Sequence, residues 1–368
     1  MDALMPNEVP ASAFRLTYQQ RDITQDITRD LIGLTYTDNL SGRSDDLQVD
    51  LMDVEGRWRS TWYPGHGDTL ALSIGWKGKA QRALGRFEID EIEAAGPPAT
   101  VSIKAVAAGI NRPMRTTEHR SYEGATLAAI AGQVAGRLGL QLTGKIAPIK
   151  LDRLTQQEPD LEFLARLAED YDYAFKIVGG QLVFHSIADL AAGPSVATLN
   201  LTDLASFRFR DQILMVPKAI QVKHKAPAKK QLISYHMING EMKAVPSSAG
   251  KAISSGDTKK QRKRAASAEV AEARAKADQA RQNRERTTTS WTLLGRPNLV
   301  SGNVVTLVSA GQFGGTFLIM SARHRLDRAG GYVVELEVCR VKAPTLKFDG
   351  TTRGAALDSY GINSEVVA

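Results

Sequence analysis

The stretch Gln156–Phe184, QQEPDLEFLARLAEDYDYAFKIVGGQLVF, predicts a helix followed by a two-stranded hairpin. Pro159 suits the first helical position, because an N–H there has no partner within the helix. Apolar side chains then recur at helical spacing and predict one buried face, formed by Leu161, Leu164, Ala165, Ala168 and Tyr171. From Tyr173 the apolar period becomes two, and Gly179-Gly180 supplies a tight turn. Such a unit is too small to be stable alone, so flanking segments must cover it.

The segments on both sides of this unit have the pattern of short strands. From Phe14 to about Ile110 apolar and polar residues alternate, and turn signals such as Pro64-Gly65 separate the runs. Strand patterns resume at Ala197 and continue, with one interruption, to Val341. We therefore predict a mainly β fold with an α+β insert, in which two similar antiparallel β-barrels flank a small α/β domain.

The predicted domain boundaries follow these changes in pattern. We expect the first β-barrel in residues 1–112 and the α/β domain in residues 113–190, which includes a helix from about Gly124 to Arg137. The second β-barrel is expected in residues 191–225 and 287–345, and its strands include Ala219 to Lys225. Residues 226–286 are expected to be an insertion of loop plus a basic, alanine-rich helix, and residues 346–368 a C-terminal tail.

The alanine-rich helix is predicted over Thr258–Arg286. The small side chains of its apolar side are spaced like a heptad seam, at Ala266, Val270, Ala273, Ala277 and Ala280. Alanine favours a helix but buries little area, so we expect this helix to be mobile or packed against a partner.

The net charge of +7 is concentrated in the same segment, which holds ten Lys or Arg and four Asp or Glu. The rest of the chain is therefore close to neutral. The candidate partner-docking site is the basic run formed by Lys259, Lys260, Arg262, Lys263 and Arg264. This run could bind phosphates, but no aromatic side chains for base stacking lie among its residues. A solvated helix start, or a patch that docks on an acidic neighbour, fits it better.

Composition excludes several classes of protein. The single cysteine, Cys339, is incompatible with an internal disulfide framework or a cysteine-rich metal site. The first residues lack a basic region followed by an apolar core, so we expect no signal peptide. No apolar run approaches membrane-spanning length, and we expect no direct membrane insertion.

Motifs for chemistry are also missing, so we expect no catalytic, cofactor-binding or metal-binding residues. Gly139–Lys145 matches the phosphate-binding spacing G-x-x-x-x-G-K, but Ile146 lacks the hydroxyl that would hold magnesium, and a helix precedes the glycines where a strand should. Gly139 is better explained as the end of that helix. Glu169 and Asp170, next to Arg166, indicate solvated charge rather than the paired acids of a glycosidase. The histidines lack metal-ligand spacing: His66, His119, His185, His224, His236 and His324.

Three stretches resemble the phage late control gene D protein family, in the family's order. The central stretch is EPDLEFLARLAEDYDYAF followed by GGQLVF. The second is GRPNLVSGNVVTLVSAGQFGGTFLIMSARHRL at Gly295–Leu326, and the third is DDLQVDLMDVEGRW with PGHGDTLALSIGW, within Asp45–Trp76. That family comprises the baseplate hub proteins of contractile phage tails and R-type pyocins. It is related to the T-even phage baseplate hub and to the N-terminal part of the VgrG spike.

The resemblance implies a trimeric symmetry adaptor that joins a six-fold tail tube to a three-fold spike. Three copies of a chain with two similar barrels would present six barrels in a ring. The implied partners are two further copies in a homotrimer, a trimeric spike protein, a hexameric tail tube or tube-initiator protein, and other baseplate components. The implied location is the bacterial cytoplasm during assembly and then the baseplate of a virion or phage-tail-like particle. No small-molecule substrate is implied.

Two functions from other classes remain as alternatives. The first is a nucleic-acid-binding or regulatory protein that acts through the basic segment at residues 258–286; the neutrality of the rest of the chain argues against it. The second is a cell-wall hydrolase, which the missing acid pair disfavours.

Overall fold

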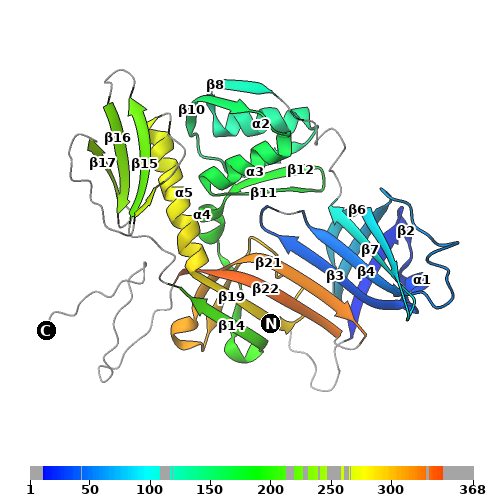
Figure 1. Cartoon of the computed structure of the whole chain (residues 1–368). Coiled ribbons are helices and arrows are strands. Elements are labelled where there is room, and N and C mark those ends of the chain that lie inside the picture. The colour runs from blue at the N-terminus through cyan, green and yellow to red at the C-terminus, as the bar shows by residue number, and fades with distance from the viewer. Residues whose placement is uncertain are drawn as a thin grey trace, which may run out of the picture.

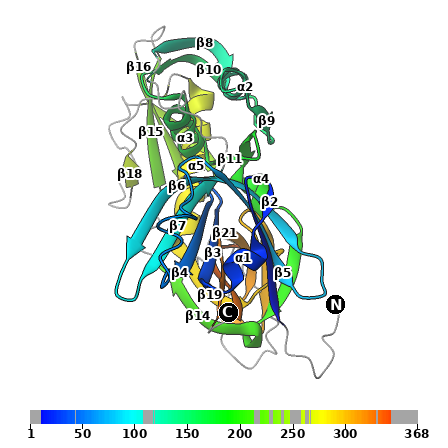
Figure 2. The ribbon, with the colours of Figure 1, turned by 90° about the vertical axis from the view of Figure 1, so that its right-hand side faces the viewer.

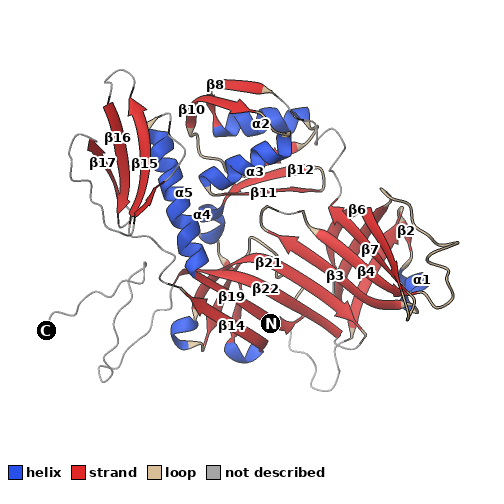
Figure 3. Cartoon of the chain, in the orientation of Figure 1, coloured by secondary structure: helices blue, strands red, loops and turns tan. Residues whose placement is uncertain are grey.

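The computed structural model describes residues 11–42, 44–107, 117, 119–212, 219–226, 231–238, 241–246, 258–260, 265, 267–328 and 331–342. Figure 1 shows a first β unit, an α/β unit, a second β unit and a small side sheet with a long helix beside it. Strands are the commonest element in all four parts (Figure 3). The predicted fold class, mainly β with an α+β insert, is confirmed, whereas the two similar antiparallel β-barrels stay a prediction.

The first β unit is an antiparallel sheet with the strand order β3-β4-β7-β6-β5-β1-β2. Side chains alternate in direction along a strand, so every second residue of each strand faces the core. In β4 these are Leu47, Val49 and Leu51, which are all buried. A short helix, α1, follows the first two strands and contributes Ile27 to the same core. Its elements are β1 (Ser12–Tyr18), β2 (Arg21–Asp22), α1 (Thr24–Thr28), β3 (Leu31–Asn39), β4 (Asp46–Met52), β5 (Thr69–Trp76), β6 (Arg82–Ala95) and β7 (Thr100–Ala107).

The second β unit has the order β14-β19-β22-β21, with β20 paired to β21 and β13 paired to β20. Every second side chain of its last strand faces the core, because Tyr332, Val334, Leu336 and Val338 are all buried. Its strands are β13 (Ser195–Asn200), β14 (Leu204–Asp211), β19 (Thr287–Leu294), β20 (Val304–Val308), β21 (Gly315–Asp327) and β22 (Gly331–Lys342), with short 3-10 helices at Leu201–Asp203 and Gly311–Phe313.

The two β units are not separate, because β21 pairs with both. One edge of β21 pairs with β22, and the other edge pairs first with β20, near Gly315–Leu318, and then with β3, from Ser321 to Asp327. The result is one 13-stranded sheet that runs through both units. In Figure 2 the first unit faces the viewer, and the strands of the second unit, such as β19 and β21, lie behind it. The sequence did not predict this continuity.

The α/β unit packs two helices between small sheets. The hairpin predicted after the central helix is confirmed as β11 and β12, and both Gly179 and Gly180 have positive φ in its turn. Gly139, also at positive φ, follows α2 and supports its interpretation as the end of that helix. The elements are β8 (Arg120–Thr126), α2 (Leu127–Arg137), β9 (Gln141–Thr143), β10 (Lys150–Gln156), α3 (Asp160–Tyr171), β11 (Tyr173–Val178), β12 (Gln181–Ser186) and α4 (Ile187–Ala191).

Two details of the central helix differ from the prediction. Pro159 is the N-cap of α3 rather than its first helical residue. The buried face is also rotated: Phe163 and Leu167 lie at its centre, whereas Leu161 and Ala165 are only partly buried. The rotation arises because α3 packs both on α2 and the hairpin and on the helix α5, which the local pattern does not include.

The region after Asp211 differs most from the prediction. Residues Ala219–Ala226 form β15, which does not join the second β unit but pairs with β16 (Gln231–Ile238) and β18 (Thr258–Lys260) in a four-stranded side sheet completed by β17 (Glu241–Pro246). The helix α5 spans Ala268–Arg286 and so begins ten residues later than expected. Much of the predicted insertion is therefore strand rather than loop; its residues 247–257 lie outside the described residues.

Candidate interaction surface at the junction of the β units

The junction between the β units is held by side chains as well as by backbone pairing. Arg328, just after β21, donates hydrogen bonds to the carbonyl oxygens of Thr28 (3.0 Å) and Arg29 (2.6 Å) at the end of α1. A cation at the C-terminal end of a helix satisfies carbonyl groups that have no partner within it. On the other side, Trp76 donates to the carbonyl oxygen of Gly295 at 3.0 Å. A Cβ atom at Gly295 would lie 2.2 Å from the Tyr332 ring, so only glycine fits this close approach.

His324 lies at the centre of the junction and is fully buried. Its Nδ1 atom is 2.9 Å from the Tyr332 hydroxyl and its Nε2 atom is 3.0 Å from the carbonyl oxygen of Leu299. The Tyr36 ring of β3 stacks on it with 5.9 Å between centroids. Burial lowers the pKa of His324 to about 4, so the ring is neutral at physiological pH. Its role here is to satisfy buried polar groups, as expected for a strand histidine.

A buried ion cluster attaches the α/β unit to this junction. Lys176 of β11 reaches Asp38 of β3 at 2.6 Å and Asp45 at 3.3 Å. Ser301, in the turn before β20, donates through its hydroxyl and its backbone N–H to the Asp38 carboxylate, at 2.7 and 2.8 Å. Both carboxylates are about 5% exposed and the lysine 17%. Segments of all three units therefore meet at a single cation.

The charges in this cluster depend on one another. Burial alone would lower the pKa of Lys176, but the two carboxylates outweigh it and raise that pKa. Burial raises the pKa of Asp45 to about 6, although Lys176 acts in the opposite direction. Removal of the cation would leave two carboxylates in a site that excludes water, which is far more costly than loss of an exposed pair.

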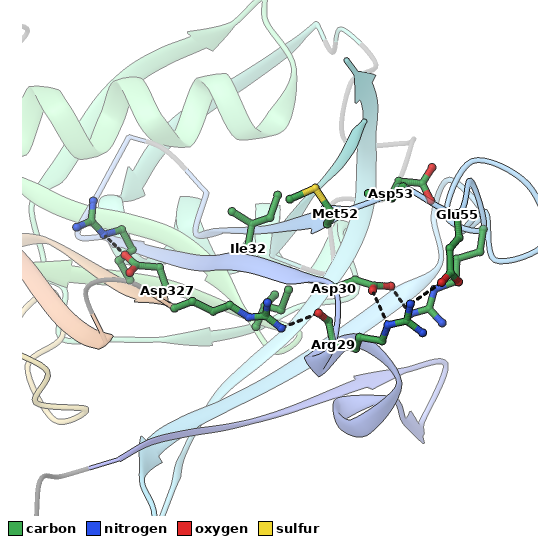
Figure 4. A pocket seen from close by; sticks show the side chains of 12 residues that line it. Arg29, Asp30, Ile32, Met52, Asp53, Glu55 and Asp327 are labelled. Atoms are coloured by element: carbon green, nitrogen blue, oxygen red, sulfur yellow. Dashed lines mark hydrogen bonds and ion pairs between the residues drawn. The ribbon is translucent and has the colours of Figure 1, made fainter. Parts of the chain in front are cut away.

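A groove of about 740 Å³ opens on the surface of the same junction. Figure 4 shows Ile32 of β3 and Met52 of β4 side by side, with Asp327 at one end and Asp30, Asp53 and Glu55 at the other. The apolar side chains of Ile32, Met52 and Val54 are 38%, 37% and 75% exposed, respectively. An apolar floor with a charged rim is the usual arrangement of a protein-binding surface.

The rim of the groove is made of ion pairs. Arg29 pairs with Glu55, Arg57 pairs with Asp30, and Arg325 lies 3.3 Å from Asp327. Arg57 also stacks on the exposed Trp62 ring, 4.5 Å from its centroid. Because these charges neutralise one another, the groove carries little net charge, and its apolar floor is its most distinctive feature.

The helix α5 is packed against the chain's own acidic groups. Three carboxylates, Glu169, Asp170 and Asp172, gather at the C-terminal end of α3, where the helix dipole disfavours negative charge. Three arginines of α5 pair with them: Arg281 with Glu169, Arg274 with Asp170 and Arg284 with Asp172. The expectation of a mobile or partner-packed helix is therefore wrong.

The seam predicted for α5 is also partly wrong. Val270 and Ala277 are buried as expected, but the other deeply buried residues are Ala271, Ala275, Asp278 and Gln282, a face displaced from the predicted one. Val270, Ala271 and Ala275 enter the core of the α/β unit. Ala266 lies outside the described residues.

The predicted partner-docking residues are only partly within the described chain. Lys259 and Lys260 lie on β18, at the edge of the side sheet, beside Ile220 and Gln221 of β15. Arg262, Lys263 and Arg264 lie outside the described residues. The docking role of this run stays a prediction.

Among the described residues no cluster of His, Cys, Asp and Glu could hold a metal ion. Cys339 is buried, and burial raises the pKa of its thiol to about 11. No helix of the described chain is both long and apolar enough to cross a membrane.

The residues that form the junction were not predicted from the sequence. Lys176 is a signal that could have been noticed, because it interrupts the apolar strand Tyr173–Val178 and needs an anionic partner if it is buried. The acids at the C-terminal end of α3, with no basic residue in the last turn, likewise predict cations from another element. Neither signal identifies which partner supplies the opposite charge.

The chain is similar in sequence to two proteins of phage tails. It is 32% identical over 194 residues to the probable baseplate hub protein of Escherichia phage P2, an alignment that covers 51% of this chain and 49% of that protein. It is also 32% identical over 197 residues to the probable baseplate hub protein of Escherichia phage 186, covering 52% and 50%. The predicted resemblance is confirmed. The chain matches about half the length of these curated relatives, and no family model matches it.

Solved structures share the fold over nearly the whole chain. The 43 kDa tail protein of prophage MuSo2 from Shewanella oneidensis superimposes with a TM-score of 0.64 at 16% identity, covering 90% of this chain and 98% of that one. A tail protein from Neisseria meningitidis gives 0.63 at 13% identity, covering 90% and 96%. An Escherichia coli component of the type VI secretion system gives 0.51 at 11% identity, covering 92% and 77%. The fold is thus one that phage tails and type VI secretion systems both use.

Proposed function

We propose that this protein is the structural hub of a contractile-tail baseplate, in a phage or an R-type pyocin. The observation that carries the proposal is the continuous sheet through two β units, combined with the similarity to proteins named baseplate hubs. In this role a homotrimer joins a six-fold tube to a three-fold spike, because each copy contributes two β units to a ring of six. The chain performs no reaction and acts through its interfaces.

The structure supports a role in which the protein transmits mechanical force from one β unit to the other. The backbone hydrogen bonds between β21 and β3 run across the boundary of the β units, and the Lys176 cluster ties the α/β unit to that boundary. Force applied to one unit therefore reaches the other through paired strands rather than through a flexible linker. The groove lined by Ile32 and Met52 offers one surface for a spike, tube or other baseplate protein.

Tail assembly tests the proposed role directly. Removal of the coding sequence from a producing strain should abolish assembled tails while the tube and sheath proteins are still made. The wild-type chain supplied from a plasmid should restore them, and electron microscopy gives the count. Tails of normal number and length without this protein would refute a hub function.

The nucleic-acid alternative is weakened because the cations of the basic helix α5 are already in ion pairs. All five cations of α5 are in ion pairs: Arg274, Lys276, Arg281, Arg284 and Arg286. Charges already paired within the chain release few counterions from DNA. We expect no gel shift with duplex DNA at 150 mM salt; a tight, salt-sensitive shift would favour the alternative instead.

Because α5 contributes to the core, its deletion would unfold neighbouring elements and would not test docking by the basic run. Charge reversal of the two described lysines, K259E/K260E, is the cleaner experiment. If the run docks on an acidic tail component, this variant should stay folded and yield fewer assembled tails than K145E, which reverses one exposed lysine elsewhere.

A further inference from the structure

The second β unit ends in an unusually open edge strand. Among the described residues β14 pairs only with β19, so its outer edge has no backbone partner. Phe207 lies opposite the fully buried Trp291 on the core side of the sheet, yet it is half exposed. Phe209 stacks between Phe207 and Phe313, with 5.1 Å between centroids on each side. The aromatic core of the unit is thus uncovered at this edge.

The opposite face of β14 is basic. Arg208 and Arg210 alternate with the phenylalanines, are exposed, and form no ion pair with another described residue. An exposed edge with apolar residues on one side is a template for an added strand. The strand that fits would be extended, with apolar side chains at one period-two set of positions and carboxylates at the other.

The first β unit presents such a strand. The pairing of β6 with β5 ends at Glu88, and the loop before β5 reaches Ile89, so among the described strands Glu91–Ala95 pairs only with β7. Along this free stretch the exposed Glu91 and Glu93 alternate with Ile92 and Ala94. Ile92 packs on the core of its unit. Lys104 is the only described cation paired with these acids, at 3.1 Å from Glu91 and 4.0 Å from Glu93.

The two edges match in spacing and in character. Arg208 and Arg210 are two residues apart, as are Glu91 and Glu93, so both pairs can face each other in one ladder. The same register brings Ile92 and Ala94 beside Phe207 and Phe209 and would cover the exposed aromatic core.

We propose that β14 of one copy adds to residues Glu91–Ala95 of β6 in the next copy, which joins copies head to tail through one sheet. This seam, β14 against the free half of β6, deepens the homotrimer proposed above and rests on it. The other free edge of the first unit, on β1, is a poorer partner because it carries Arg15 rather than acids. A head-to-tail contact between different surfaces closes into a ring when its rotation allows, and here the ring is the trimer.

Charge reversal on each side of the seam, and on both sides together, tests the proposal in the whole 368-residue chain. R208E/R210E makes both edges acidic, whereas E91R/E93R/K104E reverses the acidic edge while it keeps the local pairs. The combination of all five substitutions restores complementarity with the signs exchanged. K77E/K79E is the matched control, because it changes the net charge by the same amount as R208E/R210E at exposed positions in the β5–β6 turn.

Sedimentation velocity over a range of concentrations gives the readout, and circular dichroism confirms that each variant is folded. We expect the wild type and the control to form trimers. The dissociation constant of the trimer should rise at least about tenfold in each one-sided variant, R208E/R210E or E91R/E93R/K104E. The combined variant, which carries all five substitutions, should return to the wild-type affinity. One-sided variants that remain trimers with unchanged affinity would overturn the seam while the homotrimer stands. A combined variant that stays as weak as the one-sided ones would also overturn it, and a monomeric wild type would refute the homotrimer itself.

Discussion

At the scale of single residues, the junction depends on buried polar groups that satisfy one another. Lys176 has two carboxylates within 3.3 Å, and one of them, Asp38, is held in place by Ser301. The cluster costs desolvation energy, and its net contribution to stability is therefore small when it is intact. Its effect becomes large when one member is removed, because the remaining charges stay buried without a partner.

Substitution of Lys176 tests this asymmetry. We expect K176M to lower the free energy of unfolding by about 3–5 kcal/mol, since two buried carboxylates lose their cation. The control K145M removes an exposed lysine that pairs with Asp189 at 3.4 Å and should cost less than about 1 kcal/mol. Urea unfolding of both variants gives the comparison. Equal costs for the two would show that the buried cluster does not hold the units together.

His324 predicts a dependence of stability on pH. Its pKa in the folded chain is about 4, below its ordinary value of 6.5, because the ring is buried. The unfolded chain therefore binds a proton first as the pH falls, and the contribution of His324 to stability is lost between about pH 6.5 and 4. Asp45 acts in the opposite direction, because burial raises its pKa to about 6.

The variant H324Q removes the histidine effect alone. We expect the wild type to exceed H324Q in free energy of unfolding at pH 7.5, and this advantage to shrink by about 2 kcal/mol at pH 4.5. Urea unfolding at the two pH values measures it. An advantage that is the same at both would mean that the ring can be protonated in the folded chain.

At the scale of elements, local patterns were sufficient where the partner is a neighbour in sequence. The helix and hairpin of Gln156–Phe184 could be predicted because Gly179-Gly180 and the change of period are local signals. The strand Ala219–Ala226 could be predicted as a strand, but its sheet could not, because edge pairing is decided by contacts with β16 and β18. The face of α5 was mistaken because its buried side includes Asp278 and Gln282, which a hydrophobic pattern excludes.

Double-mutant cycles can measure how much each ion pair between α5 and α3 contributes to the stability of the fold. Arg284 pairs with Asp172, and the two side chains are 13% and 10% exposed, whereas Arg281 pairs with Glu169 at 33% and 73%. We expect a coupling energy of about 1–3 kcal/mol for the first pair and below about 1 kcal/mol for the second. Urea unfolding of the alanine variants provides both values. If the exposed pair were coupled as strongly as the buried one, ion pairing would not explain how α5 is fixed.

At the scale of the whole molecule, the decisive feature is that β21 carries both β units in one sheet. Both sets of strands could be predicted from alternation, as could the alternating core of β22. Their union could not, because it depends on β21 being long enough for β20 and β3 to share one edge, end to end. The interaction surfaces are likewise properties of the assembled sheet: the groove at Ile32 and Met52 combines β3, β4 and the end of β21.

We propose that three copies of this chain form the hub. Native mass spectrometry of this 368-residue chain, alone and mixed with the spike protein from the same tail, tests the proposal. We predict a species of three times 40.0 kDa that binds one spike trimer. A protein that stays at the mass of a single chain at every concentration, with and without the spike, would contradict the account.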